Sequence, residues 1–138
     1  MSYLLDTNVV SELRKRNRCD AGVAEWFRDV AADDLFLSVL TIGELRHGVD
    51  SLARRDRGRA ARLNQWLHDV IDGFGERILL IDRPVAEEWG RLNVPTTLPA
   101  VDGLLAATAK IHHLTLVTRN TKHVERTGVQ LLNPFRPG

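Results

Sequence analysis

Three carboxylate residues of this chain stand where an apolar segment meets a helix. Asp6 ends a short apolar segment, Glu44 lies in the first turn or so of a later helix, and Asp102 opens a nearly apolar helix. Carboxylates gathered in one cleft repel one another, and their burial is costly unless a cation is present. Oxygen ligands without cysteine or paired histidines suit Mg²⁺ or Mn²⁺. Together these acids predict a metal site of the kind that supports phosphoryl transfer.

Each acid also has a purely structural explanation. Asp, Thr and Asn are good N-cap residues, so Asp6-Thr7-Asn8 could simply begin the next helix. Asp82, which precedes Pro84, is expected to be a cap of that kind. Spacing along the chain does not establish that the acids converge, so both explanations stay open at this point.

Short apolar segments alternate with helical patterns along the whole chain. This alternation predicts one α/β domain over residues 1–138, with a mostly parallel sheet of about five strands and helices on both faces. The segments expected as strands lie near residues 3–6, 35–39, 78–81, 114–117 and 129–132. The main helices are expected near residues 20–31, 41–52, 57–73, 84–92 and 102–112. The carboxyl ends of parallel strands are where such sheets bind ligands, which favours a functional role for Asp6.

The composition is that of an ordinary soluble protein. The 138 residues are 43% hydrophobic and carry a net charge of only +1. The single cysteine, Cys19, allows no internal disulfide and excludes a cysteine-based metal site. Asp6 interrupts the apolar start, so no signal peptide is expected, and no stretch is apolar enough to span a bilayer. A cytoplasmic protein without membrane contact is the expectation.

Basic residues are clustered although the net charge is small. Arg14 and Lys15 begin one cluster that continues to Arg18, and a second runs from Arg54 to Arg62. Such clusters could neutralise phosphate groups, although charged runs are also common on solvated faces. We assign possible RNA contacts to four cationic side chains, namely Arg14, Lys15, Arg46 and Arg119.

Four segments resemble the motifs of a known family. Residues 3–13, 38–48, 102–109 and 116–120 are similar, in this order, to the four motifs of PIN domains. The likeness is strongest to the VapC-type toxins of prokaryotic type II toxin–antitoxin pairs. It covers essentially the whole chain, and four ordered motifs are far more specific than any one of them.

The resemblance implies a metal-dependent endoribonuclease with a PIN-like three-layer fold. Asp6, Glu44 and Asp102 would then be the catalytic acids that hold Mg²⁺ or Mn²⁺. Asn120 would be a further catalytic-site residue, at the position of a fourth acid in many members. Three side chains would support the carboxylates by hydrogen bonds, namely Asn8, Thr41 and Thr118.

One motif departs from the family pattern. Where members often have an Asp-Phe pair, this chain has His123-Val124, which leaves the fourth carboxylate and a second metal open. His123, isolated on a short helical segment, is expected to be an ordinary surface residue.

Three other functions compete with the ribonuclease. A phosphatase with an aspartyl nucleophile would want a second acid at Asn8, which counts against it. A catalytically weak module that binds nucleic acid or an antitoxin remains open. So does a nuclease directed at DNA, since nothing in the sequence reads the 2′-hydroxyl.

The resemblance also implies partners. An RNA substrate is expected, with a small antitoxin that covers the acidic cleft and the apolar grooves near Trp26 and Trp66. A homodimer and a larger toxin–antitoxin complex on operator DNA are expected as well.

Overall fold

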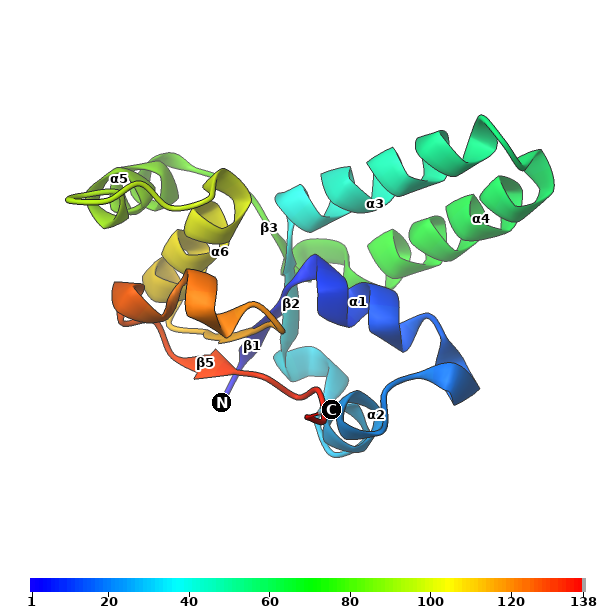
Figure 1. The fold of residues 1–138 in the computed structure, drawn as a ribbon, viewed down its shortest axis with the longest axis horizontal. Helices are drawn as coiled ribbons and strands as arrows, with labels where there is room; N and C mark the ends of the chain where they lie inside the picture. The colour runs from blue at the N-terminus through cyan, green and yellow to red at the C-terminus, as the bar shows by residue number, and fades with distance from the viewer. Residues whose placement is uncertain (138) are drawn as a thin grey trace.

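A parallel β-sheet lies at the centre of the computed structural model, which describes residues 1–137 (Figure 1). Within those residues the sheet has five strands in the order β3-β2-β1-β4-β5, and every neighbouring pair is parallel. Their bounds are Tyr3–Leu5 for β1, Leu35–Ser38 for β2, Ile78–Leu79 for β3, Thr115–Val117 for β4 and Leu131–Leu132 for β5. This confirms the expected fold class.

The strand order reverses direction beside β1. From β1 the chain moves outward to β2 and β3 on one side, and then returns to place β4 and β5 on the other. Leu5 of β1 lies opposite Val117 of β4 in the register. Open parallel sheets bind their ligands at such a reversal, just beyond the carboxyl ends of the two strands. The residues that follow Leu5 and Val117 therefore occupy the favoured position for a site.

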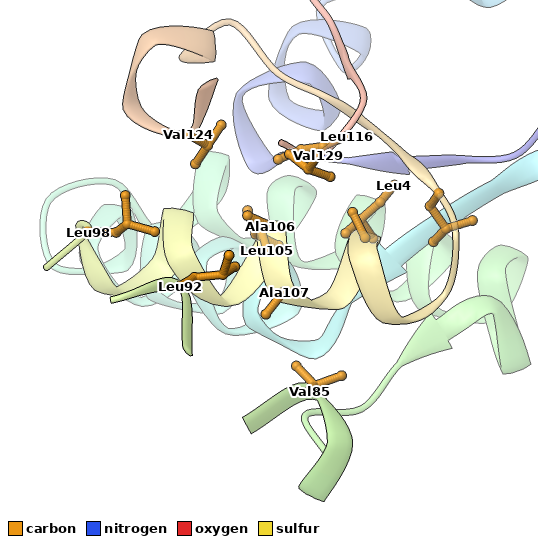
Figure 2. Close-up of a cluster of buried hydrophobic side chains, with 12 residues drawn as sticks. Leu4, Val85, Leu92, Leu98, Leu105, Ala106, Ala107, Leu116, Val124 and Val129 are labelled. Atoms are coloured by element: carbon orange, nitrogen blue, oxygen red, sulfur yellow. The ribbon is translucent and has the colours of Figure 1, made fainter. Parts of the chain in front are cut away.

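Both faces of the sheet are buried, because adjacent strand residues point to opposite sides. Leu4 and Leu116 belong to one apolar cluster, whereas Leu5 and Val117 belong to the other. Figure 2 shows the first cluster, in which Leu105 of α6 packs among side chains from the strands and from α5. The alternation gives the sheet two hydrophobic layers to stabilise it.

Helices cover the two faces unequally. On one side of the strands in Figure 1 lie α5 (Arg83–Leu92) and α6 (Ala100–Ile111). The other side carries α1 (Thr7–Leu13), α2 (Ala21–Arg28), α3 (Val39–Ala53) and α4 (Arg57–Phe74). Helices α3 and α4 pack against each other as a long hairpin that extends away from the sheet. The result is the three-layer arrangement expected from the sequence.

Local capping explains where several helices begin. Asp82 accepts a hydrogen bond from the Val85 amide, which confirms it as the cap of α5. Asp20 likewise caps α2. The expected start of α3 at Thr41 was wrong, because the Ser38 hydroxyl accepts from the Leu40 amide and begins the helix at Val39.

The C-terminal segment packs over the start of α2. The Arg136 amide donates to the Asp20 carboxylate at 3.2 Å, and its guanidinium contacts Glu25 at 2.8 Å. A Cβ atom on Gly22 would lie 2.3 Å from the Pro134 carbonyl oxygen. Only glycine at this position therefore allows the two segments to approach so closely.

Glu12 joins two helices through a nearly buried carboxylate. It accepts the Asp20 amide at 2.8 Å and lies 3.0 Å from the Lys15 ammonium group. The Asp20 amide, with help from Lys15, lowers the pKa of Glu12 below its ordinary value. The charged form of this carboxylate thus stabilises the connection from α1 to α2.

We expect stability to fall in acid partly because of Glu12. A carboxyl with a lowered folded-state pKa stabilises the protein above its unfolded pKa of about 4.5, and the contribution is lost as pH falls below it. Glu12→Gln should lower stability at pH 7 by about 1 kcal/mol, since it removes a charge-assisted hydrogen bond. Urea unfolding of both proteins from pH 7 to pH 3 measures this. If the free energy of unfolding changed with pH in the same way for both proteins, the role assigned to Glu12 would be contradicted.

In the part of the chain that the structure describes, no helix is long and apolar enough to cross a bilayer.

Candidate functional site

Asp6 lies at the reversal of the strand order. It directly follows β1, and its backbone amide donates to the Val117 carbonyl of β4 at 2.9 Å. This bond fixes the residue between the carboxyl ends of the two central strands. Asp6 is only 7% exposed, so its side chain is nearly enclosed.

The Asp6 carboxylate is held from several sides. Its Oδ1 accepts from the Thr7 amide at 2.6 Å, which also makes Asp6 the N-cap of α1. Its Oδ2 accepts from the Thr118 hydroxyl at 2.7 Å and from the Asn8 amide nitrogen at 3.3 Å. Capping therefore does not exclude a role in a site, since Oδ1 caps the helix while Oδ2 faces Thr118 and Asn8.

Glu44 is connected to Asp6 through Thr7. The Thr7 hydroxyl donates to Glu44 Oε1, while its backbone amide holds Asp6. The hydroxyl oxygens of Thr7 and buried Thr41 are 3.2 Å apart, so Thr41 reaches Glu44 only through Thr7. Sequence reasoning did not assign Thr7 a supporting role, although its position directly after the acid is the signal that could have indicated one.

Glu44 lies deeper in its helix than expected. Because α3 begins at Val39, Glu44 is in the second turn rather than the first. A full turn along a helix still leaves it on the side of α3 that faces Thr7.

Asp102 does not open its helix. Pro99 precedes the first helical residue, Ala100, and places Asp102 as the third residue of α6. Proline suits the beginning of a helix, which explains the earlier start. Asp102 remains in the first turn, where the helix dipole favours a negative charge.

His123 contacts Asp102, contrary to the expectation of an ordinary surface residue. Its Nδ1 lies 2.8 Å from Asp102 Oδ2, although the histidine side chain is 52% exposed. Twenty-one positions separate the two residues in the sequence. The hydrophobic pattern gives no signal for this contact, which depends on how α6 packs beside the segment after β4.

The electrostatics of the three acids favour a bound cation. Burial is the main reason that the pKa of Asp6 is raised above its ordinary value, and the negative charges of Asp102 and Glu44 raise it further. Bonds from Thr118 and Thr7 act in the opposite direction. A cation placed among these carboxylates would relieve the repulsion.

The donor set fits a hard divalent ion in its chemistry. Carboxylate oxygens are the ligands that Mg²⁺ and Mn²⁺ prefer. Across residues 1–137, however, no group of three acidic, histidine or cysteine side chains is placed so that it could hold a metal ion. The chemistry of the three acids therefore suits such an ion, and their joint role as its ligands stays a prediction.

Asn120 and Asn8 organise the loop after β4. The backbone amide of Asn120 donates to the Thr118 hydroxyl at 3.0 Å, and Asn8 Oδ1 accepts from the backbone amide of Arg119 at 3.3 Å. The Asn120 side chain is exposed. Its predicted catalytic role, like the roles assigned to the acids themselves, stays a prediction.

Two of the four cations assigned to RNA contact make close internal contacts. Lys15 lies beside Glu12, and Arg46 donates to the Asn64 side chain at 2.8 Å between α3 and α4. Arg46 therefore has a structural use that the sequence did not indicate.

The other two cations stack on aromatic rings. Arg14 lies 5.8 Å from the centre of the Trp66 ring, and Arg119 lies 4.8 Å from that of Phe135. Arg119 directly follows Thr118, whose hydroxyl donates to Asp6. Its contact with RNA stays a prediction.

A mainly apolar pocket of about 640 Å³ opens between α1, α2 and α4. Phe27, Val70 and Phe74 contribute to its apolar lining, and Trp66 lies on its wall. Four arginines and one acid also line it, namely Arg14, Arg16, Arg28, Arg77 and Asp69. Trp26 instead packs edge-on against Tyr3, with 5.2 Å between the ring centres.

Comparison with known proteins gives a consistent family. The PIN domain family model matches residues 3–129. The chain is 35% identical to Toxin FitB of Neisseria gonorrhoeae, over 96% of this chain and 97% of that one. It is 31% identical to VapC ribonuclease Y4jK of Sinorhizobium fredii, over 97% of this chain and 98% of that one.

A solved structure agrees with the sequence relatives. The crystal structure of FitAcB from Neisseria gonorrhoeae superposes with a TM-score of 0.88 at 35% identity, and the match covers 96% of this chain and 97% of that one. The extent of these matches, together with the acids at the reversal of the sheet, places the chain in the PIN-domain family.

Proposed function

We propose that residues 1–138 form one PIN domain that hydrolyses RNA phosphodiester bonds and acts as the toxin of a toxin–antitoxin pair. The observation that carries this proposal is Asp6 at the reversal of the sheet, where burial in the first place, and then Asp102 and Glu44, disfavour its negative charge. The relatives named as a toxin and as a VapC ribonuclease support the choice of substrate.

PIN-domain ribonucleases generally need a divalent metal. Mg²⁺ is the ion proposed for this chain, with Mn²⁺ as a substitute, and Asp6, Glu44 and Asp102 would hold it. When bound, such an ion stabilises the negative charge that develops on the phosphate and makes a bound water more acidic. An RNA substrate also makes the cytoplasm the proposed location.

The neighbouring residues orient the acids for this task. Thr118 and the Thr7 amide fix the Asp6 carboxylate, and the Thr7 hydroxyl fixes Glu44. Asn120 lies close to Thr118 with its side chain exposed, and the side-chain amide can donate to a substrate oxygen. The guanidinium of Arg119 would contact an RNA phosphate, which positions the strand without reading its bases.

The apolar pocket between α1, α2 and α4 is the proposed antitoxin site. Its lining is rich in apolar atoms, and its arginines outnumber its single acid. An amphipathic segment with apolar anchors and acidic flanks would match both features. The solved structure titled as a toxin-antitoxin complex from Klebsiella pneumoniae supports an antitoxin partner, and that of FitAB bound to an IR36 DNA fragment supports a DNA-bound assembly. A homodimer is part of the same proposal.

Cleavage of purified total RNA tests the proposal. Antitoxin-free protein should produce discrete cuts with Mg²⁺ or Mn²⁺ and none in excess EDTA, and mapping of the cut ends would identify the target. Parallel reactions with single-stranded DNA separate an RNA nuclease from a DNA nuclease. Full activity in EDTA would contradict metal dependence, whereas metal binding without any cleavage would favour a binding module.

A further inference from the structure

His123 links two segments that both border the acidic site. It ends the short 3₁₀ turn Thr121–His123, and its backbone amide donates to the Asn120 carbonyl at 3.1 Å. The ring then reaches across to α6, where Nδ1 lies 2.8 Å from Asp102 Oδ2. The loop after β4 is thereby joined to the first turn of α6.

The chemistry of the contact fixes its direction. An ionised carboxylate has only acceptor atoms, so the hydrogen must be on Nδ1 of His123 and is donated to Asp102. In the neutral ring this leaves Nε2 without a proton. The bond occupies Oδ2 of Asp102 and leaves Oδ1 with its lone pairs for another partner.

The surroundings of the pair distinguish the two side chains. The Asp102 side chain is 17% exposed, whereas the His123 side chain is 52% exposed. Asp102 also contributes to the raised pKa of Asp6, so its carboxylate lies within electrostatic reach of the buried acid. The orientation of the Asp102 carboxylate therefore matters to the site, and His123 is the side chain placed to set it.

We propose that His123 is a positioning residue, which donates a hydrogen bond from Nδ1 to Asp102 and so aims Oδ1 of that carboxylate at the metal position. This inference rests on the proposed metal-dependent function. Hydrogen bonds to metal-ligating groups generally fix their orientation, and their removal lowers metal affinity or activity by about 10- to 100-fold. A surface ion pair without that role would affect only stability, and only slightly.

Substitution of His123 by each of the two amide-bearing residues, Asn and Gln, tests which position of the donor nitrogen is required. The Asn side-chain nitrogen takes nearly the same place as Nδ1 of histidine, whereas the longer Gln side chain places its nitrogen near Nε2. His123→Asn should therefore keep the bond, and His123→Gln and His123→Ala should lose it. His112→Ala is the matched control, because His112 is exposed just beyond the opposite end of α6.

Calorimetry with Mn²⁺ gives the first result, since it needs no RNA. His123→Ala and His123→Gln should weaken Mn²⁺ binding by about 10- to 100-fold, while His123→Asn and His112→Ala stay close to the wild type. Melting temperatures should be similar for all of the variants. In RNA cleavage at limiting Mn²⁺, kcat should fall in the same order, and KM for RNA should stay unchanged.

Several outcomes would overturn the assignment. Mn²⁺ binding by His123→Ala equal to that of the wild type would do so, as would an asparagine variant as weak as the alanine variant. Nitrogen-15 spectra that show the hydrogen on Nε2 of neutral His123 would also contradict it. A wild-type protein that binds no Mn²⁺ would overturn this inference and the proposed metal site together.

Failure of the proposed nuclease function looks different. In that case the wild type binds Mn²⁺, and the variants follow the expected order in calorimetry, but no protein cleaves RNA. The role of His123 toward Asp102 would then stand, while the reaction assigned to the site would not.

Discussion

Asp6→Asn should abolish RNA cleavage while the fold remains intact. The substitution removes the central carboxylate of the site, which lies between β1 and β4 and is nearly enclosed. A metal-held carboxylate contributes several kcal/mol to the transition state, so we expect a loss of at least about 1000-fold in kcat. Single-turnover cleavage of a mapped RNA target, with Mg²⁺ in excess, measures it.

The same variant should not lose stability. Burial and the charges of Asp102 and Glu44 disfavour ionised Asp6, so its neutral replacement removes an unfavourable charge. The melting temperature of Asp6→Asn without metal should equal or exceed that of the wild type. A Mn²⁺ concentration of 100 times Kd should add about 2.7 kcal/mol to the stability of the wild type and so raise its melting temperature. The melting temperature of the variant should not respond to Mn²⁺.

A matched control separates the site from charge in general. Asp33 is exposed in a short turn before β2, so Asp33→Asn removes one negative charge away from the site. It should keep both cleavage and the response to Mn²⁺. An active Asp6→Asn protein, or one stabilised by Mn²⁺ as strongly as the wild type, would refute the assignment.

Phe27→Ala should release the antitoxin without impairing the nuclease. Phe27 is 41% exposed and lines the pocket between α1, α2 and α4, whose lining includes none of the three acids. Aromatic anchors in such pockets commonly contribute about 2 kcal/mol to binding, so Kd should rise by roughly 30-fold. Calorimetric titration with the purified cognate antitoxin measures the change.

Cleavage without antitoxin should be the same for Phe27→Ala and for the wild type. Leu80→Ala is the control, because Leu80 is 68% exposed and does not line the pocket. It should bind the antitoxin as tightly as the wild type. Unchanged affinity in Phe27→Ala would place the antitoxin elsewhere on the protein.

Local sequence was sufficient for much of the fold. Side chains alternate along a strand and repeat every three or four positions along a helix, so apolar spacing reports which faces are buried. The short segment before Asp6 and the stripe of α4 could both be found in this way. Element ends were less certain, because a cap such as Ser38 or Pro99 shifts a start by two residues.

The acids could be named from the sequence because each lies near the end of a recognisable strand or within the first two turns of a helix. Their connections could not be named in this way. Thr7 joins Asp6 to Glu44, and His123 joins Asp102 to the loop after β4, through contacts between residues far apart in the chain. No local pattern encodes such distances.

The sequence by itself determined the element types, the parallel sheet and the identity of the acids, since these depend on periodicity and on residue chemistry. Only the tertiary structure decided that Asp6 lies at the reversal of the strands and that Arg46 contacts Asn64. It also decided that His123 faces Asp102. The physical reason is that side-chain contacts across the sheet depend on how whole helices pack, and packing is a property of the complete chain.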